Sequence, residues 1–153
     1  MFKKITLFFL LLTSLNFYSQ AQSITNYGFT AASGTFTALS SGNSLTLSGG
    51  NTINGYFNNI PIGFNFWYMG TRYTNVSAST NGWLTLGANI TAAVTGNSLS
   101  NNGSPRPVLA PLWDNHDIQA VGNVTYKTTG TAGSQIFTVE YLNVKWNRAA
   151  GGN

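Results

Sequence analysis

The strongest secondary-structure pattern in the chain is the stretch Ile60-Pro61-Ile62-Gly63-Phe64-Asn65-Phe66-Trp67-Tyr68. Large apolar residues occupy every second position, so a β-strand would gather them on one face and place Trp67 on the other. Because Pro61 cannot donate a ladder hydrogen bond, the strand should lie at a sheet edge or begin just after this residue. The pattern predicts a strand with one buried face and with Trp67 exposed.

Working outward from this stretch, similar short runs are separated by Gly- and Asn-rich turns, and helical periodicity is absent. Asn81-Gly82 is a type I′ hairpin signal, and residues 129–134 carry two glycines suited to a second hairpin loop. The sequence therefore predicts an all-β fold, an antiparallel β-sandwich or a jelly-roll-like fold. The further strands are expected at residues 27–31, 34–39, 73–79, 83–87, 108–113, 123–128 and 135–146. The polar residues 88–106 should hide a weak strand near 90–94 or form a surface loop.

The N-terminus has the pattern of a secretory signal peptide. Lys3 and Lys4 precede an apolar run, and Ser19-Gln20-Ala21 provides small residues for cleavage. The apolar run is about eight residues long, far short of the ~20 that a spanning helix needs. We expect residues 1–21 to be removed and residues 22–153 to form a single domain, secreted or on the outer cell surface, without stable membrane insertion.

Charge and cysteine content narrow the class of protein. The 153-residue chain has seven basic and three acidic residues, and two of the basic ones lie in the signal. The other five are scattered, whereas a nucleic-acid footprint needs several on one face, so we expect no nucleic-acid partner. Cysteine is absent, so an exported domain of this length must rely on its core, as a bacterial envelope protein would.

The C-terminal residues suggest that the domain is incomplete at Asn153. Lys145-Trp146-Asn147-Arg148 is still strand-like, and residues 149–153 resemble a hairpin turn with no return strand. A naturally flexible terminus would have the same composition. We expect an N-terminal fragment of a longer protein, whose downstream domains would be partners of this one.

The densest polar segment is Asp114-Asn115-His116-Asp117, which contains the only His of the chain. Asp114, Asn115 and Asp117 could offer oxygen ligands to Ca²⁺, although two carboxylates would bind it weakly. Alternatively, these side chains cap backbone groups where a strand turns into a loop. Three acids leave little to support a catalytic pair, and neither a Gly-x-Ser-x-Gly elbow nor a zinc motif accompanies His116. We therefore expect no enzyme activity and no cofactor, with Ca²⁺ as the one open question.

Aromatic residues are the other candidates for binding. Trp67 and Trp83 could stack on sugar rings beside neutral Asn and Thr side chains, although large rings are more often core material. If the face of Phe64 and Phe66 is buried, Trp67 is the ring most exposed to a ligand.

Several segments together resemble a known family, the N-terminal β-rich modules of exported Bacteroidetes cell-surface proteins. The matching stretches are residues 27–36, 60–66, 76–86, 108–114, 137–141 and 144–146. The segment Ala110-Pro111-Leu112-Trp113-Asp114 is also similar to part of nidogen-type extracellular domains. Family members usually carry a second acid and an apolar residue where this chain has Asn115 and His116, which weakens a metal site carried over from the family.

The resemblance implies a module that precedes adhesive, fibronectin-type or enzymatic domains in cargo of type IX secretion. We therefore expect a non-catalytic β-sandwich module that acts in adhesion or as a structural spacer. The alternative is a carbohydrate-binding module attached to an extracellular enzyme. Its partner would be an extracellular glycan, whereas an adhesion module would bind a protein.

Overall fold

The computed structural model describes residues 28, 30–92 and 105–146. The chain divides into two units, residues 1–31 and 32–153. Of the first unit, residues 28, 30 and 31 are described and have no regular secondary structure. The expected signal peptide at 1–21 and the expected hairpin turn after Trp146 lie outside the described residues.

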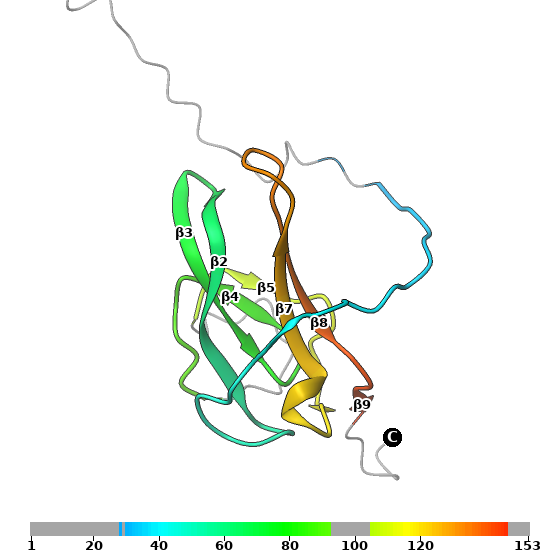
Figure 1. Cartoon of the computed structure of the whole chain (residues 1–153). Coiled ribbons are helices and arrows are strands. Elements are labelled where there is room, and N and C mark those ends of the chain that lie inside the picture. The colour runs from blue at the N-terminus through cyan, green and yellow to red at the C-terminus, as the bar shows by residue number, and fades with distance from the viewer. Residues whose placement is uncertain (1–27, 29, 93–104, 147–153) are drawn as a thin grey trace, which may run out of the picture. The chain divides into compact units, whose positions relative to one another are not determined.

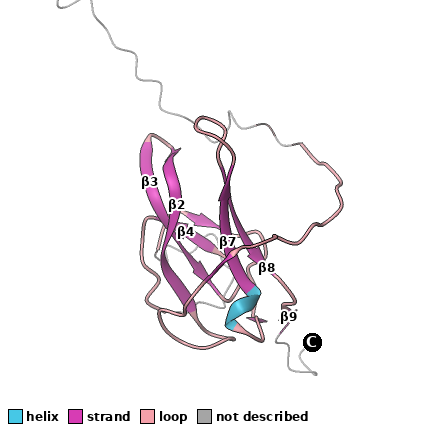
Figure 2. Ribbon diagram, viewed as in Figure 1, coloured by secondary structure: helices cyan, strands magenta, loops and turns pink. Residues whose placement is uncertain are grey.

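The second unit is almost entirely β-structure, with three antiparallel sheets among its described residues (Figures 1 and 2). One sheet has the order β2-β3-β4-β5, another β1-β7-β8, and a small one pairs β6 with β9. The all-β sandwich is confirmed. The elements are β1 (Asn43–Ser44), β2 (Tyr56–Tyr68), β3 (Thr71–Ser79), β4 (Leu84–Leu86), β5 (Val108–Leu109), β6 (His116–Asp117), η2 (Val121–Asn123), β7 (Val124–Thr129), β8 (Ile136–Tyr141) and β9 (Lys145–Trp146).

Strand β2 follows the predicted alternation. Ile60 and Ile62 are buried, Phe64 is half-buried, and Pro61 and Gly63 between them are exposed. As Pro61 requires, β2 is an edge strand, although it begins at Tyr56 rather than near the proline. Its pairing with β3 is interrupted by two register shifts, the first between Phe57 and Ile60.

The core lies between the two larger sheets. It is built from buried residues of β2, β3, β4 and β7 together with Ile118, and half-buried residues of β8 pack against it. Two cross-sheet hydrogen bonds fix the alignment. The Thr128 hydroxyl donates to the Ile62 carbonyl at 2.6 Å, and the Tyr141 hydroxyl donates to the Ser79 carbonyl at 2.8 Å. Strand β7 therefore covers β2, and β8 covers the end of β3.

Several sequence expectations are corrected. Residues 34–39 form no strand, and Phe36 is 70% exposed; the described part of 27–31 is likewise irregular. The strand expected at 108–113 ends at Leu109, and the one expected at 135–146 breaks between β8 and β9. These segments alternate in sequence but have no neighbouring strand over their full length, so their backbone groups cannot form a ladder.

The polar segment 88–106 is held to β2 without being a strand in its described part. The Asn58 side chain donates to the Ile90 carbonyl and accepts from the Ile90 amide, at 3.0 and 2.9 Å. One amide side chain thus replaces the two bonds that a neighbouring strand would make. Ile90 is buried as a result, and residues 93–104 lie outside the described part.

Candidate interaction surface

The turn from β3 to β4 differs from the predicted type I′ geometry. Such a turn needs positive φ at both central residues, but of Asn81 and Gly82 only Gly82 has it, at 74°. The Ser79 amide donates to the Trp83 carbonyl and the Gly82 amide donates to the Ser79 carbonyl. The hairpin is therefore present, with a three-residue loop whose last residue is left-handed.

This turn and the loop of residues 112–116, which contains Asp114, form one structural unit. The Leu112 amide donates to the Gly82 carbonyl and the Asp114 amide donates to the Asn81 carbonyl. The His116 amide donates to the Asn81 side-chain oxygen at 3.2 Å. Trp83 and Trp113 pack with ring centroids 5.5 Å apart. The loop from 112 to 116 thus covers the turn, and we call these two segments the turn–loop unit.

Asp114 and Asp117 each accept a hydrogen bond from a backbone amide one or two residues further along the chain. Asp114 Oδ1 accepts from the Asn115 amide and Asp117 Oδ1 from the Gln119 amide, each at 2.7 Å. Among the described residues, no three His, Cys, Asp or Glu side chains gather as metal ligands would. The geometry is that of aspartates that cap turns, the alternative to Ca²⁺ binding.

We expect millimolar Ca²⁺ to leave the melting temperature of the protein unchanged relative to chelator. The reason is that Asp114 and Asp117 supply only two carboxylates and no group of three His, Cys, Asp or Glu side chains gathers in the described chain, whereas Ca²⁺ takes six to eight oxygen ligands. A site occupied at a hundredfold excess over Kd would add about 2.7 kcal/mol of stability. Differential scanning calorimetry checks this; a rise that Asp117→Asn abolishes would re-establish the calcium site.

His116 is 1% exposed, and neither ring nitrogen has a hydrogen-bond partner in the described part of the chain. Its ring meets Trp146 edge-on, with centroids 4.5 Å apart. Burial lowers the pKa of His116, and the nearby Asp114 charge opposes this only in part. The imidazole of this β6 residue is therefore buried and neutral, with its ring against Trp146 of β9.

Stability should consequently fall as the pH drops through the range where a free histidine titrates. The unfolded chain binds a proton near pH 6.5, whereas the folded chain resists protonation, so acid favours unfolding. Because the chain has one His, its NMR signal is unambiguous in untagged protein. We expect a titration midpoint below 6.5 and a melting temperature that decreases between about pH 7.5 and 5.5, above the range of the carboxyl groups. A midpoint at or above the free value would contradict the burial.

The two candidate sugar-stacking residues differ in how far their side chains are exposed. Trp67 is 64% exposed near the β2–β3 turn, as predicted, but Trp83 is 1% exposed. Trp83 cannot stack on a sugar, so its assignment to a glycan site is wrong. The cause is the turn–loop unit, in which a segment about thirty positions away in the sequence covers this ring.

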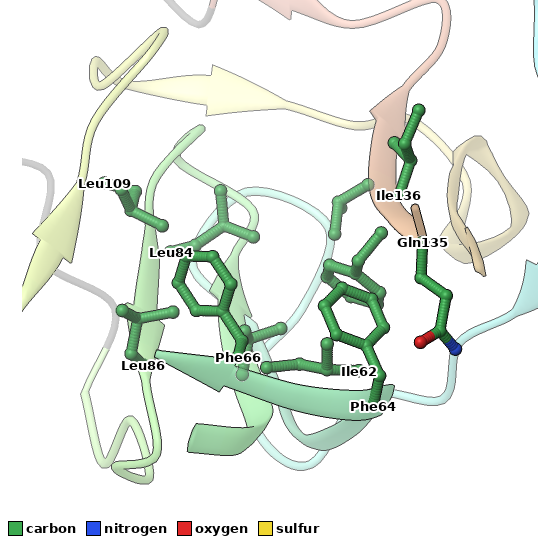
Figure 3. Close-up of a pocket in the computed structure, with 11 residues that line it drawn as sticks. Ile62, Phe64, Phe66, Leu84, Leu86, Leu109, Gln135 and Ile136 are labelled. Atoms are coloured by element: carbon green, nitrogen blue, oxygen red, sulfur yellow. The ribbon is translucent and has the colours of Figure 1, made fainter. Parts of the chain in front are cut away.

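A cavity of about 390 Å³ lies between the two larger sheets. Figure 3 shows Leu84, Leu86 and Leu109 on one side of it and Gln135 and Ile136 on the other. Among the described residues that line it, Gln135 alone is polar and none is charged. This cavity could not be predicted from the sequence, because its walls come from several strands whose pairing no local pattern reveals.

Exposed apolar side chains surround this cavity and continue onto the neighbouring hairpin. Three residues line the cavity and are also exposed to solvent: Phe66, Leu109 and Ile136. Trp67 at the end of β2 and Met69 in the β2–β3 turn are also exposed, although neither lines the cavity. The β2–β3 turn and the β7–β8 loop lie at the same end of this unit (Figure 1). We call these five side chains the apolar end.

Comparison with known proteins assigns the family. No curated protein and no solved structure matched the chain, whereas the family model described as NIDO related matches residues 26–153. The match includes Ala110 to Asp114, so the nidogen-like resemblance is confirmed. The described residues contain no helix with the length and apolarity needed to cross a bilayer. A β-rich domain of this kind fits a non-catalytic module in an extracellular context, and the chain belongs to the NIDO-related family.

Proposed function

We propose that this chain is a non-catalytic module of a secreted or cell-surface protein and that it acts in adhesion, by binding a protein partner. The observation that carries the proposal is the apolar end, where three large apolar side chains are exposed at the rim of a cavity and two more are exposed at the β2–β3 turn. Grouped exposed apolar residues mark interaction sites, whereas single ones are ordinary. The charged residue nearest to this surface along the β2–β3 hairpin is Arg72, which lies opposite Trp67 in the strand register.

The setting of the module is part of the same proposal. The family match and the signal-like residues 1–21 support an exported protein. The resemblance to N-terminal modules of Bacteroidetes surface proteins supports a bacterial source and type IX secretion. Further domains of the same polypeptide would then follow this module and position it at the cell surface.

Adhesion can be measured with beads that carry the purified protein. We expect retention on films of extracellular proteins such as collagen or fibrinogen, and loss of retention in a Trp67→Ala, Met69→Ser double variant. Phe36→Ala is the matched control, because Phe36 is 70% exposed and lies outside the apolar end. Equal retention of the double variant and the wild type would remove the apolar end from the proposal.

A carbohydrate-binding module is the second candidate, favoured by the exposed ring of Trp67. In that case the beads would be retained on polysaccharide films, free oligosaccharide would release them, and Trp67→Ala alone would abolish saturable binding. Retention on protein films that oligosaccharide cannot reverse would exclude the glycan role. An enzyme would instead have to lose a measurable activity in Asp114→Asn or Asp117→Asn while remaining folded.

A further inference from the structure

The inner face of one sheet extends beyond the strands that cover it. Strand β7 covers β2 and β8 covers the end of β3, through the bonds of Thr128 to Ile62 and of Tyr141 to Ser79. The sheet β2-β3-β4-β5 then continues by two more strands, while β8 is the last strand of its own sheet. Leu84 and Leu109, paired in register on β4 and β5, line the cavity at this place. The cavity therefore has the position of one missing strand beside β8.

Among the described strands none pairs with the outer edge of β8, and this edge has the backbone groups that an added strand would use. The Leu142 amide donates to the Asn123 carbonyl, which fixes the alternation of bonded pairs along β7 and β8. The N–H and C=O groups of Phe137, Val139 and Tyr141 consequently point away from β7. Within the described chain, no backbone bond outside the β7–β8 ladder uses them.

Strands β2 and β8, each at one edge of its own sheet, differ in how they are protected. Strand β2 contains Pro61, two register shifts and left-handed residues at Asn59 and Gly63, all of which prevent further pairing. Strand β8 pairs without a shift over six residues and has neither proline nor glycine. Its single charged residue is Glu140, whose side-chain oxygen accepts a hydrogen bond from the Leu39 amide at 2.7 Å. An edge this regular is open to pairing.

We propose that the edge of β8 accepts an extended peptide segment of a partner protein as an added strand. Residues of the guest that face Phe137 and Val139 would bond to β8 and would also direct their side chains into the cavity. Because the described lining has no charge, these alternate residues must be apolar and none of them can be proline. The inference rests on the proposed binding function and names the chemistry of its partner.

The probe is a synthetic peptide of alternating valine and threonine with lysines at both ends, and binding is followed by fluorescence anisotropy. Two N-methylated isomers form a matched pair. Methylation of the valine amides removes the donors that face β8 and should weaken binding by about tenfold or more, since several hydrogen bonds are lost. Methylation of the threonine amides, which face away, should change the affinity by less than about twofold.

Two protein variants test the cavity. Leu109→Trp places a large ring at the mouth and should abolish peptide binding. Leu112→Trp is its control, because Leu112 is as exposed as Leu109, at 45% and 44%, and does not line the cavity. Equal binding of the two methylated isomers, or full binding by Leu109→Trp, would overturn the inference.

Other occupants give different results. A neutral fluorophore such as N-phenylnaphthylamine tests for a small apolar ligand. If it binds, is displaced by decanol and is not displaced by the peptide, the cavity belongs to such a ligand. Dimerisation in sedimentation that Leu109→Trp abolishes would assign it to a second copy of the chain. Retention on protein films without any peptide binding would reject the added strand alone, whereas loss of both would reject the adhesion proposal as well.

Discussion

Replacing Trp83 by alanine will lower the free energy of unfolding by about 3–5 kcal/mol, the usual cost of removing a large buried ring. Trp83 is almost completely buried and packs against Trp113 of the turn–loop unit. The cavity left behind would lie between the β3–β4 turn and a loop that is held by only a few hydrogen bonds. Since domains of this size are stable by roughly 5–15 kcal/mol, the variant would lose a large part of its stability.

Guanidinium denaturation followed by circular dichroism measures this loss, with the slope of the transition as a check on the unfolded state. Trp67→Ala is the matched control, because the same ring is deleted at an exposed position and should cost no more than about 0.5 kcal/mol. If the two variants were equally stable, Trp83 could not be a core residue, and the packing described for the turn–loop unit would be contradicted.

Gly82→Ala should destabilise the protein more than Gly70→Ala does, for two reasons that add. Its φ of 74° costs a non-glycine residue about 1–2 kcal/mol. A Cβ at this position would lie 2.2 Å from the Leu112 carbonyl oxygen, which is backbone and cannot rotate away. The loop must therefore move, which breaks the bonds of Leu112 and Asp114 to the turn, each worth about 0.5–1.5 kcal/mol.

Gly70→Ala separates these two contributions. Gly70 has nearly the same φ, 76°, in the turn between β2 and β3, but an added Cβ meets nothing within 4 Å. It should lose only the conformational cost, so thermal or chemical denaturation should show at least about twice the loss for Gly82→Ala. Similar losses would mean that the loop does not contact the turn as closely as described.

The fold could be predicted where a single stretch carries its own pattern. Ile60 and Ile62 face the core as their alternation requires, and Asn81-Gly82 does mark a hairpin. The same rule failed at residues 34–39, where Phe36 alternates with small polar residues and is nevertheless exposed. Alternation describes a strand that has a sheet to join, and no local pattern reveals which partner strand is present.

The candidate sites could be predicted only in part, because burial depends on segments far apart in the sequence. The exposure of Trp67 follows from its position opposite Phe66 in one strand. The burial of Trp83 and His116 does not, since each is covered by a segment about thirty residues away. The turn residues 79–83 and the segment Leu112 to Asp114, which carry the family resemblance, turn out to contact one another. These contacts stabilise the fold.

The connectivity of the sheets also sets the order in which the structure can assemble. The β2–β3 and β7–β8 hairpins join residues close in sequence and can close within about 1–10 μs, as isolated hairpins do. Strand β1 pairs with β7 through only two residues, Asn43 and Ser44, across more than eighty positions. Because closing so long a loop gains little from so short a ladder, we expect β1 to join after the two hairpins have formed. Residues 39–44 can therefore separate from β7 while both hairpins stay folded, which makes this segment the natural entry point for a protease.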